Sequence, residues 1–296
     1  GDYTAPQHLD KVSTILKGIK AAVSPSTVVR YAKGCAIRDT TEHNINEAVE
    51  IAKSSDAVVL VLGGSSARDF KTEYIDTGAA QVNSNESELI PDMESGEGYD
   101  RSTLKLLGLQ EDLLDAVLAV GKPVIVIYIQ GRPLDMNMAS QRADALLTAW
   151  YPGQEGGTAV ADVIFGDYNP AGRLPVSVPR SVGQLPVYYS LGKQANYVEE
   201  SSSPLYAFGY GLSYTNFEYS NLNIEQFNDH IEISFNIRNE GETDGHEVAQ
   251  LYIRDDVSSV YTPPIQLKDF EKVFIKKGES KTVTFKLTPQ QLSLYN

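Results

Sequence analysis

The sequence has few of the residues that bind metals, cross-link chains or attract nucleic acid. Cys35 is the only cysteine among 296 residues, so an internal disulfide is excluded. The four histidines are scattered, which argues against a zinc site. The 25 basic residues are outnumbered by 39 acidic ones, giving a net charge of −14 and a pI of about 4.7. Nucleic acid and anionic membranes therefore fit this chain poorly as partners, whereas a neutral ligand such as a sugar fits it well.

Long hydrophobic runs are missing as well. No stretch of about 18 apolar residues occurs, so no membrane-spanning helix is expected. No basic segment followed by an apolar one opens the chain, so no signal peptide is visible. The hydrophobic fraction of 42% is nevertheless ordinary for a globular protein, and the length is comfortable for two domains.

The first two thirds of the chain alternate strand and helix patterns. Continuous apolar runs predict buried strands at 57–64, 122–131 and 143–153, with shorter strands at 28–32 and 173–178. Apolar residues at helical spacing predict helices at 45–52, 109–118 and 155–167, the first of them capped by Thr40 or Thr41. This alternation predicts an α/β domain over residues 1–200, with a mostly parallel sheet and helices on both faces.

Beyond residue 200 the pattern changes to short alternating strands separated by Gly, Asn and Asp turns. The clearest of about five strands are SYTNFEYSNLNI, HIEISFNIRNEG, EVAQLYIRDD and KTVTFKL. They predict an antiparallel β-sandwich over residues 201–296. The stretch from Tyr188 to Tyr210, rich in Tyr, Ser, Pro and Gly, is interpreted as the linker between the domains.

A stretch of about 45 residues between Gly64 and Gly108 shows no sustained period. Loops of that length in compact domains are usually functional or disordered. This one follows a strand predicted to be central, and ligands of open α/β sheets bind outside the carboxyl ends of strands. Its acidic second half does not match an EF-hand, although an irregular calcium site stays open, and no nucleotide or serine-hydrolase motif occurs. Carboxylate chemistry is what remains.

Glu97 stands between two glycines in SGEGYDR, residues 95–101. A general acid must be protonated, which requires a pKa raised by burial or by neighbouring negative charge. Retaining glycosidases place two carboxylates about 5 to 5.5 Å apart across the scissile bond. Glu94 and Glu97 lie on one short segment and would not flank a sugar. The alternative interpretation of Glu97 is a solvated loop carboxylate, and Arg101 is expected to bond the loop to its base.

Several segments, taken together and in order, resemble the C-terminal region of family 3 glycoside hydrolases of the β-glucosidase and β-xylosidase type. The resemblance covers nearly the whole chain. It rests on VVLVLGGSSARDF, SGEGYDRSTLKL, GKPVIVIYIQGRPL, the run from ADALLTAWYPGQEGG to LPVYY, and PLYAFGYGLSYTNFEYSNL. It implies an α/β sandwich followed by a fibronectin III-like β-sandwich. The first strand of the former and the last strands of the latter are expected to be missing from this chain.

The resemblance also implies roles for individual residues. An N-terminal (β/α)8 barrel of the same protein would carry an aspartate nucleophile, and the α/β domain would contribute the acid/base glutamate. Glu97 best matches that glutamate, with Glu94 as its rival. The GGSSARDF segment resembles a loop that reaches the sugar site, so Arg68, Asp69 and Phe70 are candidate substrate contacts. The alternatives are a local ion pair for Arg68 and Asp69, and packing for Phe70.

The function implied is that of a retaining exo-β-glycosidase, which hydrolyses terminal β-D-glucosyl or xylosyl residues of an oligosaccharide or glycoside. No cofactor is expected, and the piece alone is expected to be inactive. Nucleic acid and membranes are not expected as partners, and a homodimer is left open. A periplasmic or secreted bacterial location is expected. The alternative is a non-catalytic module that binds carbohydrate or protein.

Overall fold

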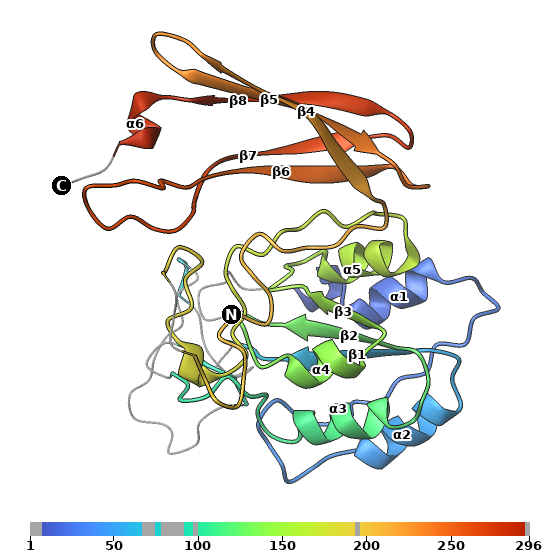
Figure 1. Ribbon diagram of the computed structural model, residues 1–296. Helices are drawn as coiled ribbons and strands as arrows, with labels where there is room; N and C mark the ends of the chain where they lie inside the picture. Colours follow the sequence, from blue (N-terminus) through green and yellow to red (C-terminus); the bar gives the residue numbers. More distant parts are fainter. Residues whose placement is uncertain (1–7, 67–74, 78–91, 97–99, 193–195, 294–296) are drawn as a thin grey trace. The chain divides into compact units, whose positions relative to one another are not determined.

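The computed structural model describes residues 8–66, 75–77, 92–96, 100–192 and 196–293. The chain divides into two compact units (Figure 1). Unit 1 comprises residues 1–165 and 180–183, and unit 2 comprises residues 166–179 and 184–296. The domain boundary at residue 200 stays a prediction.

Unit 1 is built on a parallel sheet with the strand order β1-β2-β3 in its described part. The strands are β1 (Val58–Gly63), β2 (Val124–Ile129) and β3 (Ala145–Thr148). They confirm the three strands predicted from continuous apolar runs. The central strand explains why such a run lacks alternation, since Val126, Ile127 and Tyr128 are all fully buried.

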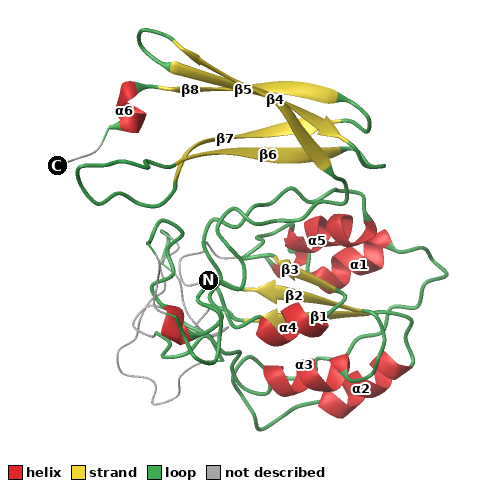
Figure 2. Cartoon of the chain, viewed as in Figure 1, coloured by secondary structure: helices red, strands yellow, loops and turns green. Residues whose placement is uncertain are grey.

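Helices cover both faces of this sheet, as predicted. Figure 2 shows α1 (Ile15–Ala22) and α5 (Gly156–Phe165) on one face, and α2 (Ile45–Lys53), α3 (Gln110–Leu118) and α4 (Asn137–Arg142) on the other. Two 3₁₀ turns, η1 (Leu9–Lys11) and η2 (Val182–Gln184), complete the helical segments. The helices α1 and α4 were not predicted. No helix within the described ranges is long and apolar enough to cross a membrane.

Three local predictions in this part of the chain are wrong. Residues 28–32, all described, form no strand, because their side chains are largely exposed and no neighbouring strand pairs with them. The N-cap position of α2 is Asn44, whose side chain makes no capping hydrogen bond, while Thr41 bonds the Asp39 carboxylate through its N–H and hydroxyl. Residues 173–178 contribute one isolated antiparallel bridge, Val178 to Tyr206, since Pro175 lies within this short run and Pro179 follows it, and proline cannot donate to a ladder.

Unit 2 confirms the predicted antiparallel β-sandwich. Its strands are β4 (Phe217–Gln226), β5 (Ile231–Asn239), β6 (Gly245–Ile253), β7 (Gln266–Ile275) and β8 (Ser280–Leu287), followed by α6 (Pro289–Leu292). They form one sheet in the order β4-β5-β8 and a second in the order β6-β7. The core contains Ile237, Ala249, Ile275, Val283 and Phe285.

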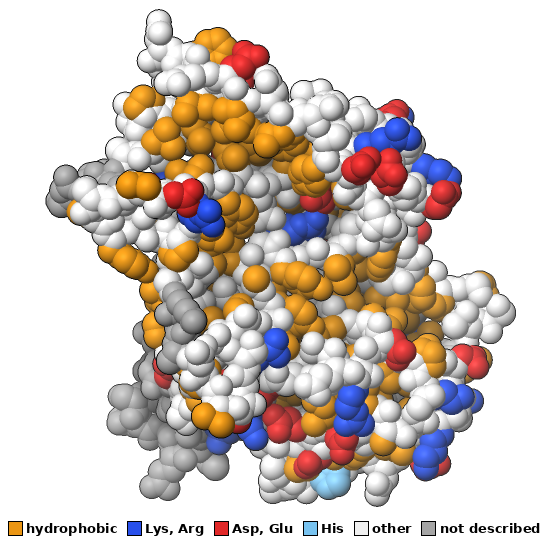
Figure 3. Space-filling view, viewed as in Figure 1, with side chains coloured by type: hydrophobic (Ala, Val, Ile, Leu, Met, Phe, Trp, Pro, Cys, Tyr) orange, Lys and Arg blue, Asp and Glu red, His pale blue; other side chains and the backbone are white. Residues whose placement is uncertain are grey.

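The edge strand β4 contributes little to this core, which it meets at its first residue, Phe217. Its side chains are exposed on both faces of the sheet except at its first residue, and Leu222 and Ile224 are among the exposed apolar residues of the unit. Figure 3 shows apolar side chains gathered over the strands of this unit. The alternating pattern therefore indicated the strand conformation of β4, but neither face of this strand is buried beyond its first residue.

Candidate active site

The carboxyl end of β1 is shaped by two consecutive glycines. Gly63 has a φ of +131°, and a Cβ at this position would lie 1.9 Å from the Ile129 carbonyl oxygen of β2. A Cβ at Gly64 would lie 2.3 Å from the Cβ of Glu94. Only glycine tolerates both approaches. The pair therefore lets the chain leave the sheet beside β2 and brings residue 94 against the strand end.

The described part of the long loop is anchored at Asp92. Its carboxylate accepts hydrogen bonds from three consecutive backbone N–H groups, those of Ile37, Arg38 and Asp39, at 3.2, 2.6 and 3.1 Å. The next side chain, Met93, is buried in the core. Backbone N–H groups that converge in this way hold an anion firmly, so residues 92 and 93 are fixed to the body of unit 1.

Glu94 is a buried carboxylate held by two arginines. Its side chain is 2% exposed, and its Oε1 lies 2.9 Å from Arg101 Nη1 and 3.6 Å from Arg132 Nε. The Ser95 hydroxyl donates to Oε2 at 2.9 Å, and the Glu94 N–H donates to the Ser65 carbonyl at 2.8 Å. Both carboxylate oxygens therefore have an ion-pair or hydrogen-bond partner, as a buried charge requires. We call Glu94, Arg101, Arg132 and Asp100 the ion cluster.

The ion cluster extends to the surface at Asp100. Arg132, which follows β2, donates from Nη1 to Asp100 Oδ1 at 2.8 Å. The pKa of Asp100 is lowered from its ordinary value, chiefly by the hydrogen bond from the Arg101 N–H and then by the Arg132 guanidinium. Asp100 is thus ionised at neutral pH and accepts hydrogen bonds. Arg101 also donates to the Lys105 carbonyl, which confirms that it bonds the loop to its base.

The predicted site residues divide into described and undescribed ones. Glu94 is described, and it is enclosed in the ion cluster. Glu97 and the segment from Arg68 to Phe70 lie outside the described residues, so their roles stay predictions. The sequence places Glu97 three residues after Glu94 and four before Arg101, between two members of the ion cluster. Within the described ranges no three His, Cys, Asp or Glu side chains gather as a metal site.

Gln110 is a site residue that the sequence reasoning missed. Its buried side chain accepts the Gly63 N–H at 2.8 Å and donates to the carbonyls of Gly63 and Ile37 at 2.9 and 3.1 Å. This amide ties the end of β1 to the start of α3 and to the segment that binds Asp92. A lone glutamine at a helix start carries no pattern that distinguishes it from a surface residue, so no signal in the sequence could have found it.

Replacing Gln110 with leucine is expected to destabilise this edge of the sheet. The Gly63 N–H and the two carbonyls would lose their partners, at about 1–3 kcal/mol for each buried group left unsatisfied. Urea unfolding of the chain, followed through the transition of unit 1, measures the loss. The matched control is Gln154→Leu at an exposed position, with an expected change within about 0.5 kcal/mol. Equal stability of the two variants would contradict this role of Gln110.

Two family models match the chain. The model of the glycosyl hydrolase family 3 C-terminal domain matches residues 1–214, and that of a fibronectin type III-like domain matches residues 247–296. The first covers unit 1 with its parallel sheet, and the second begins within β6. The two models agree with the order of a parallel α/β unit followed by an antiparallel sandwich.

Relatives named as glycosidases cover the chain along most of its length. A "Beta-xylosidase" of Formosa agariphila is 40% identical over 96% of this chain, and a "Periplasmic beta-glucosidase" of Salmonella typhimurium is 36% identical over 100% of it. A solved β-glucosidase from Erythrobacter marinus has a TM-score of 0.79 at 35% identity, covering 95% of this chain and 38% of its own.

The length of these relatives limits what the similarity covers. The chain spans 37% of the Formosa protein and 40% of the Salmonella protein. The similarity therefore concerns one part of longer proteins. With a family model over more than half of its residues and with relatives matched along nearly all of it, the chain belongs to glycosyl hydrolase family 3 and carries that family's C-terminal domain followed by a fibronectin type III-like domain.

Proposed function

We propose that this chain supplies the acid/base half of a retaining exo-β-glycosidase that removes terminal β-D-glucosyl or xylosyl residues. The nucleophile would be an aspartate on an N-terminal barrel of the same protein. The observation that carries the proposal is the ion cluster at the carboxyl ends of β1 and β2, whose members Glu94 and Arg101 enclose Glu97 in the sequence. The substrate class follows from relatives named β-xylosidase and β-glucosidase.

Glu97 is proposed as the acid/base in preference to Glu94. A general acid must reach the glycosidic oxygen within hydrogen-bond distance. Glu94 cannot do so in the described arrangement, because its side chain is 2% exposed and its oxygens face Arg101, Arg132 and Ser95. Its role is to hold the base of the loop, and we therefore assign the acid/base role to Glu97.

The proposed reaction uses Glu97 twice. It first donates its proton to the leaving oxygen while the aspartate attacks the anomeric carbon, giving a covalent glycosyl-enzyme and a free alcohol. It then takes a proton from water, whose oxygen attacks the same carbon and releases the sugar with retained configuration. Asp100 is ionised and bonded to Arg132, so it has no proton to donate in the first step.

Arg68, Asp69 and Phe70 are proposed as contacts to the sugar. They begin three residues after Ser65, whose carbonyl accepts the Glu94 N–H. Residues 65 and 94 of the long loop thus lie side by side at one edge of the sheet, which supports assigning residues 68–70 and Glu97 to a single site. A guanidinium and a carboxylate bond hydroxyls well, and an aromatic ring can cover an apolar sugar face.

The 296-residue chain alone is expected to hydrolyse no glycoside, since it would hold one carboxylate of the catalytic pair. The measurement is release of p-nitrophenol from p-nitrophenyl β-glucoside and β-xyloside by this chain, beside the longer protein that includes the barrel. Turnover by the isolated chain that disappears in its own Glu97→Ala variant would contradict the division of the pair. Lack of turnover by the longer protein would favour a non-catalytic binding module instead.

The similarity to the named relatives also supports proposals about the location and the partners of the protein. One relative is named a periplasmic β-glucosidase, and with it we propose a periplasmic or secreted location. The proposed partners are the oligosaccharide or glycoside substrate and the barrel of the same protein, while a homodimer stays a prediction without support from the described residues.

A further inference from the structure

Unit 2 contains a cavity that the proposed reaction does not use. Its volume is about 640 Å³, and it is lined by residues within 187–192 and 202–210, together with Ser177, with Gln250 and Tyr252 of β6, and with Ile265 just before β7. Pockets that bind small molecules typically span about 300–1,000 Å³. All the lining residues belong to unit 2, so the cavity is a feature of this unit by itself.

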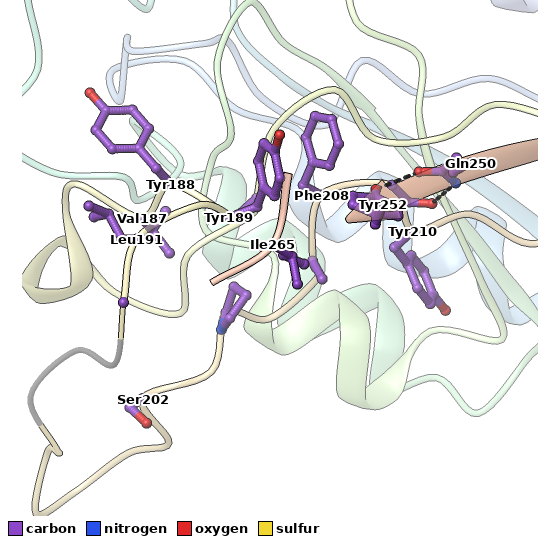
Figure 4. A pocket seen from close by; sticks show the side chains of 15 residues that line it. Val187, Tyr188, Tyr189, Leu191, Ser202, Phe208, Tyr210, Gln250, Tyr252 and Ile265 are labelled. Carbon is purple, nitrogen blue, oxygen red and sulfur yellow. Dashed lines mark hydrogen bonds between the residues drawn. The ribbon is translucent and has the colours of Figure 1, made fainter. Parts of the chain in front are cut away.

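One wall of the cavity is a fixed aromatic stack. The ring of Tyr189 stacks on Phe208 with centroids 4.2 Å apart, and meets Tyr252 edge-on at 6.2 Å. The Tyr189 hydroxyl accepts the N–H of Leu267 at 3.2 Å, which fixes the orientation of its ring. Figure 4 shows Tyr189 and Phe208 side by side, with Tyr188 on one side of them and Tyr252 and Gln250 on the other. The wall is therefore preorganised.

Beside this wall lies an oriented amide. The Tyr252 hydroxyl donates to Gln250 Oε1 at 2.7 Å, and Gln250 Nε2 donates to the Gly209 carbonyl at 3.1 Å (Figure 4). Gly209 has a φ of +78°, and a Cβ there would lie 2.3 Å from Gln250 Oε1. The glycine thus permits this contact. An amide nitrogen carries two hydrogens and a hydroxyl has two lone pairs, so capacity for further hydrogen bonds remains.

The lining has no charge. Among the described residues, the side chains around the cavity are aromatic, aliphatic, hydroxyl or amide groups, and none is ionised at neutral pH. Two tyrosines contribute exposed rings, Tyr188 at 67% and Tyr210 at 42% exposure. Exposed aromatic rings next to fixed polar groups are typical of recognition surfaces. An ionic ligand would find no counter-charge here. An uncharged ligand with apolar faces and hydroxyls would match both the aromatic rings and the polar groups of the lining.

We propose that this cavity is a second carbohydrate site, which binds an uncharged oligosaccharide chain without hydrolysing it. Pyranose rings stack their C–H faces on the rings of Tyr188 and Tyr210, and hydroxyls bond the amide of Gln250 and the hydroxyl of Tyr252. The class of oligosaccharide, β-linked glucosyl or xylosyl, rests on the proposed function. The site itself does not, because none of its residues belongs to the ion cluster or to the loop that contains Glu97.

Isothermal titration of the 296-residue chain with cellohexaose and with xylohexaose tests the proposal. We expect saturable binding of at least one of them, weakened about three- to tenfold by Tyr188→Ala and again by adding Tyr210→Ala, as the loss of one ring contact each implies. Tyr188→Phe keeps the ring and is expected to retain the affinity. The control is Tyr31→Ala, which removes a tyrosine of unit 1 that is 61% exposed and is expected to leave binding unchanged.

Three results would overturn the second site. They are no saturable binding of either oligosaccharide, the same affinity in the Tyr188→Ala/Tyr210→Ala double variant with an unchanged unfolding temperature, and loss of binding in Glu97→Ala. The last result would assign the binding to the catalytic loop. If Glu97→Ala instead keeps full activity in the longer protein while binding still depends on Tyr188, the proposed function fails and the second site stands.

Discussion

Replacing Glu97 with alanine in the longer protein is expected to lower kcat/KM for an alkyl or oligosaccharide substrate by about 10²–10⁴-fold, the usual contribution of a general acid or base. Such substrates have basic leaving groups that cannot depart without a proton. The measurement is steady-state hydrolysis of cellobiose or xylobiose. The matched control is Glu88→Ala, another glutamate of the same loop, which is expected to stay within about twofold of the unchanged protein.

The same variant gives a sharper result when the leaving group is varied. A 2,4-dinitrophenolate leaves without a proton, so glycosylation of the nucleophile should be nearly normal in Glu97→Ala and deglycosylation should limit turnover. A burst of dinitrophenol followed by a slow steady state is therefore expected. A uniform loss across all leaving groups, without a burst, would instead indicate a structural role for Glu97.

Replacing Arg101 with methionine is expected to cost unit 1 about 3–5 kcal/mol of stability. The reason is that Glu94, with 2% of its side chain exposed, would lose its partner at 2.9 Å and remain a buried charge beside Arg132 alone. Chemical unfolding of the chain measures the loss. The double variant Glu94→Gln/Arg101→Met is expected to recover part of it, because no uncompensated charge remains in the site.

An exposed ion pair of the same unit provides the control for Arg101. Arg142 lies 2.5 Å from Asp115, with side chains 39% and 62% exposed. Exposed pairs contribute about 0–1 kcal/mol, so Arg142→Met should change stability little. If both arginine variants lost the same amount, the ion cluster would not be the anchor of the loop, and the preference for Glu97 over Glu94 would lose its structural reason.

The sheet of unit 1 could be predicted from the sequence because strands buried on both faces consist of continuous apolar runs. The runs that became β1, β2 and β3 are continuous and apolar, as strands of a covered parallel sheet must be. Residues 28–32 form a shorter run of this kind but no strand. Val28 and Val29 favour extended backbone, yet only a neighbouring strand turns an extended segment into part of a sheet.

The candidate site was less visible in the sequence, because its contacts join distant positions. Arg101 was predicted to hold the loop, and it does so seven residues from its partner Glu94. Arg132 and Asp92 form hydrogen bonds or ion pairs with residues 32 to 55 positions away in the sequence, and only the fold brings these residues together. The pattern of acids in the loop could not separate a buried structural glutamate from a proposed catalytic one, since Glu94 and Glu97 lie only three residues apart.

The stretch from Tyr188 to Tyr210 illustrates a different limit. Its Tyr, Ser, Pro and Gly content was interpreted as a linker, and within the described residues it forms no helix or strand other than the one bridge at Tyr206. Its side chains nevertheless line the cavity of unit 2. Composition alone cannot distinguish a solvated connection from an irregular segment that packs its tyrosines, because the difference lies in the β6 residues, Gln250 and Tyr252, that meet it.

The acid/base role of Glu97 is tested most directly by chemical rescue with product identification. The Glu97→Ala variant of the longer protein is given 2,4-dinitrophenyl β-glucoside with sodium azide, and the product is identified by proton NMR. Azide needs no general base, so we expect turnover to rise severalfold and β-glucosyl azide to form, with the configuration retained through a covalent intermediate. Normal turnover of the variant without azide, together with no glycosyl azide in its presence, would contradict the assignment of Glu97.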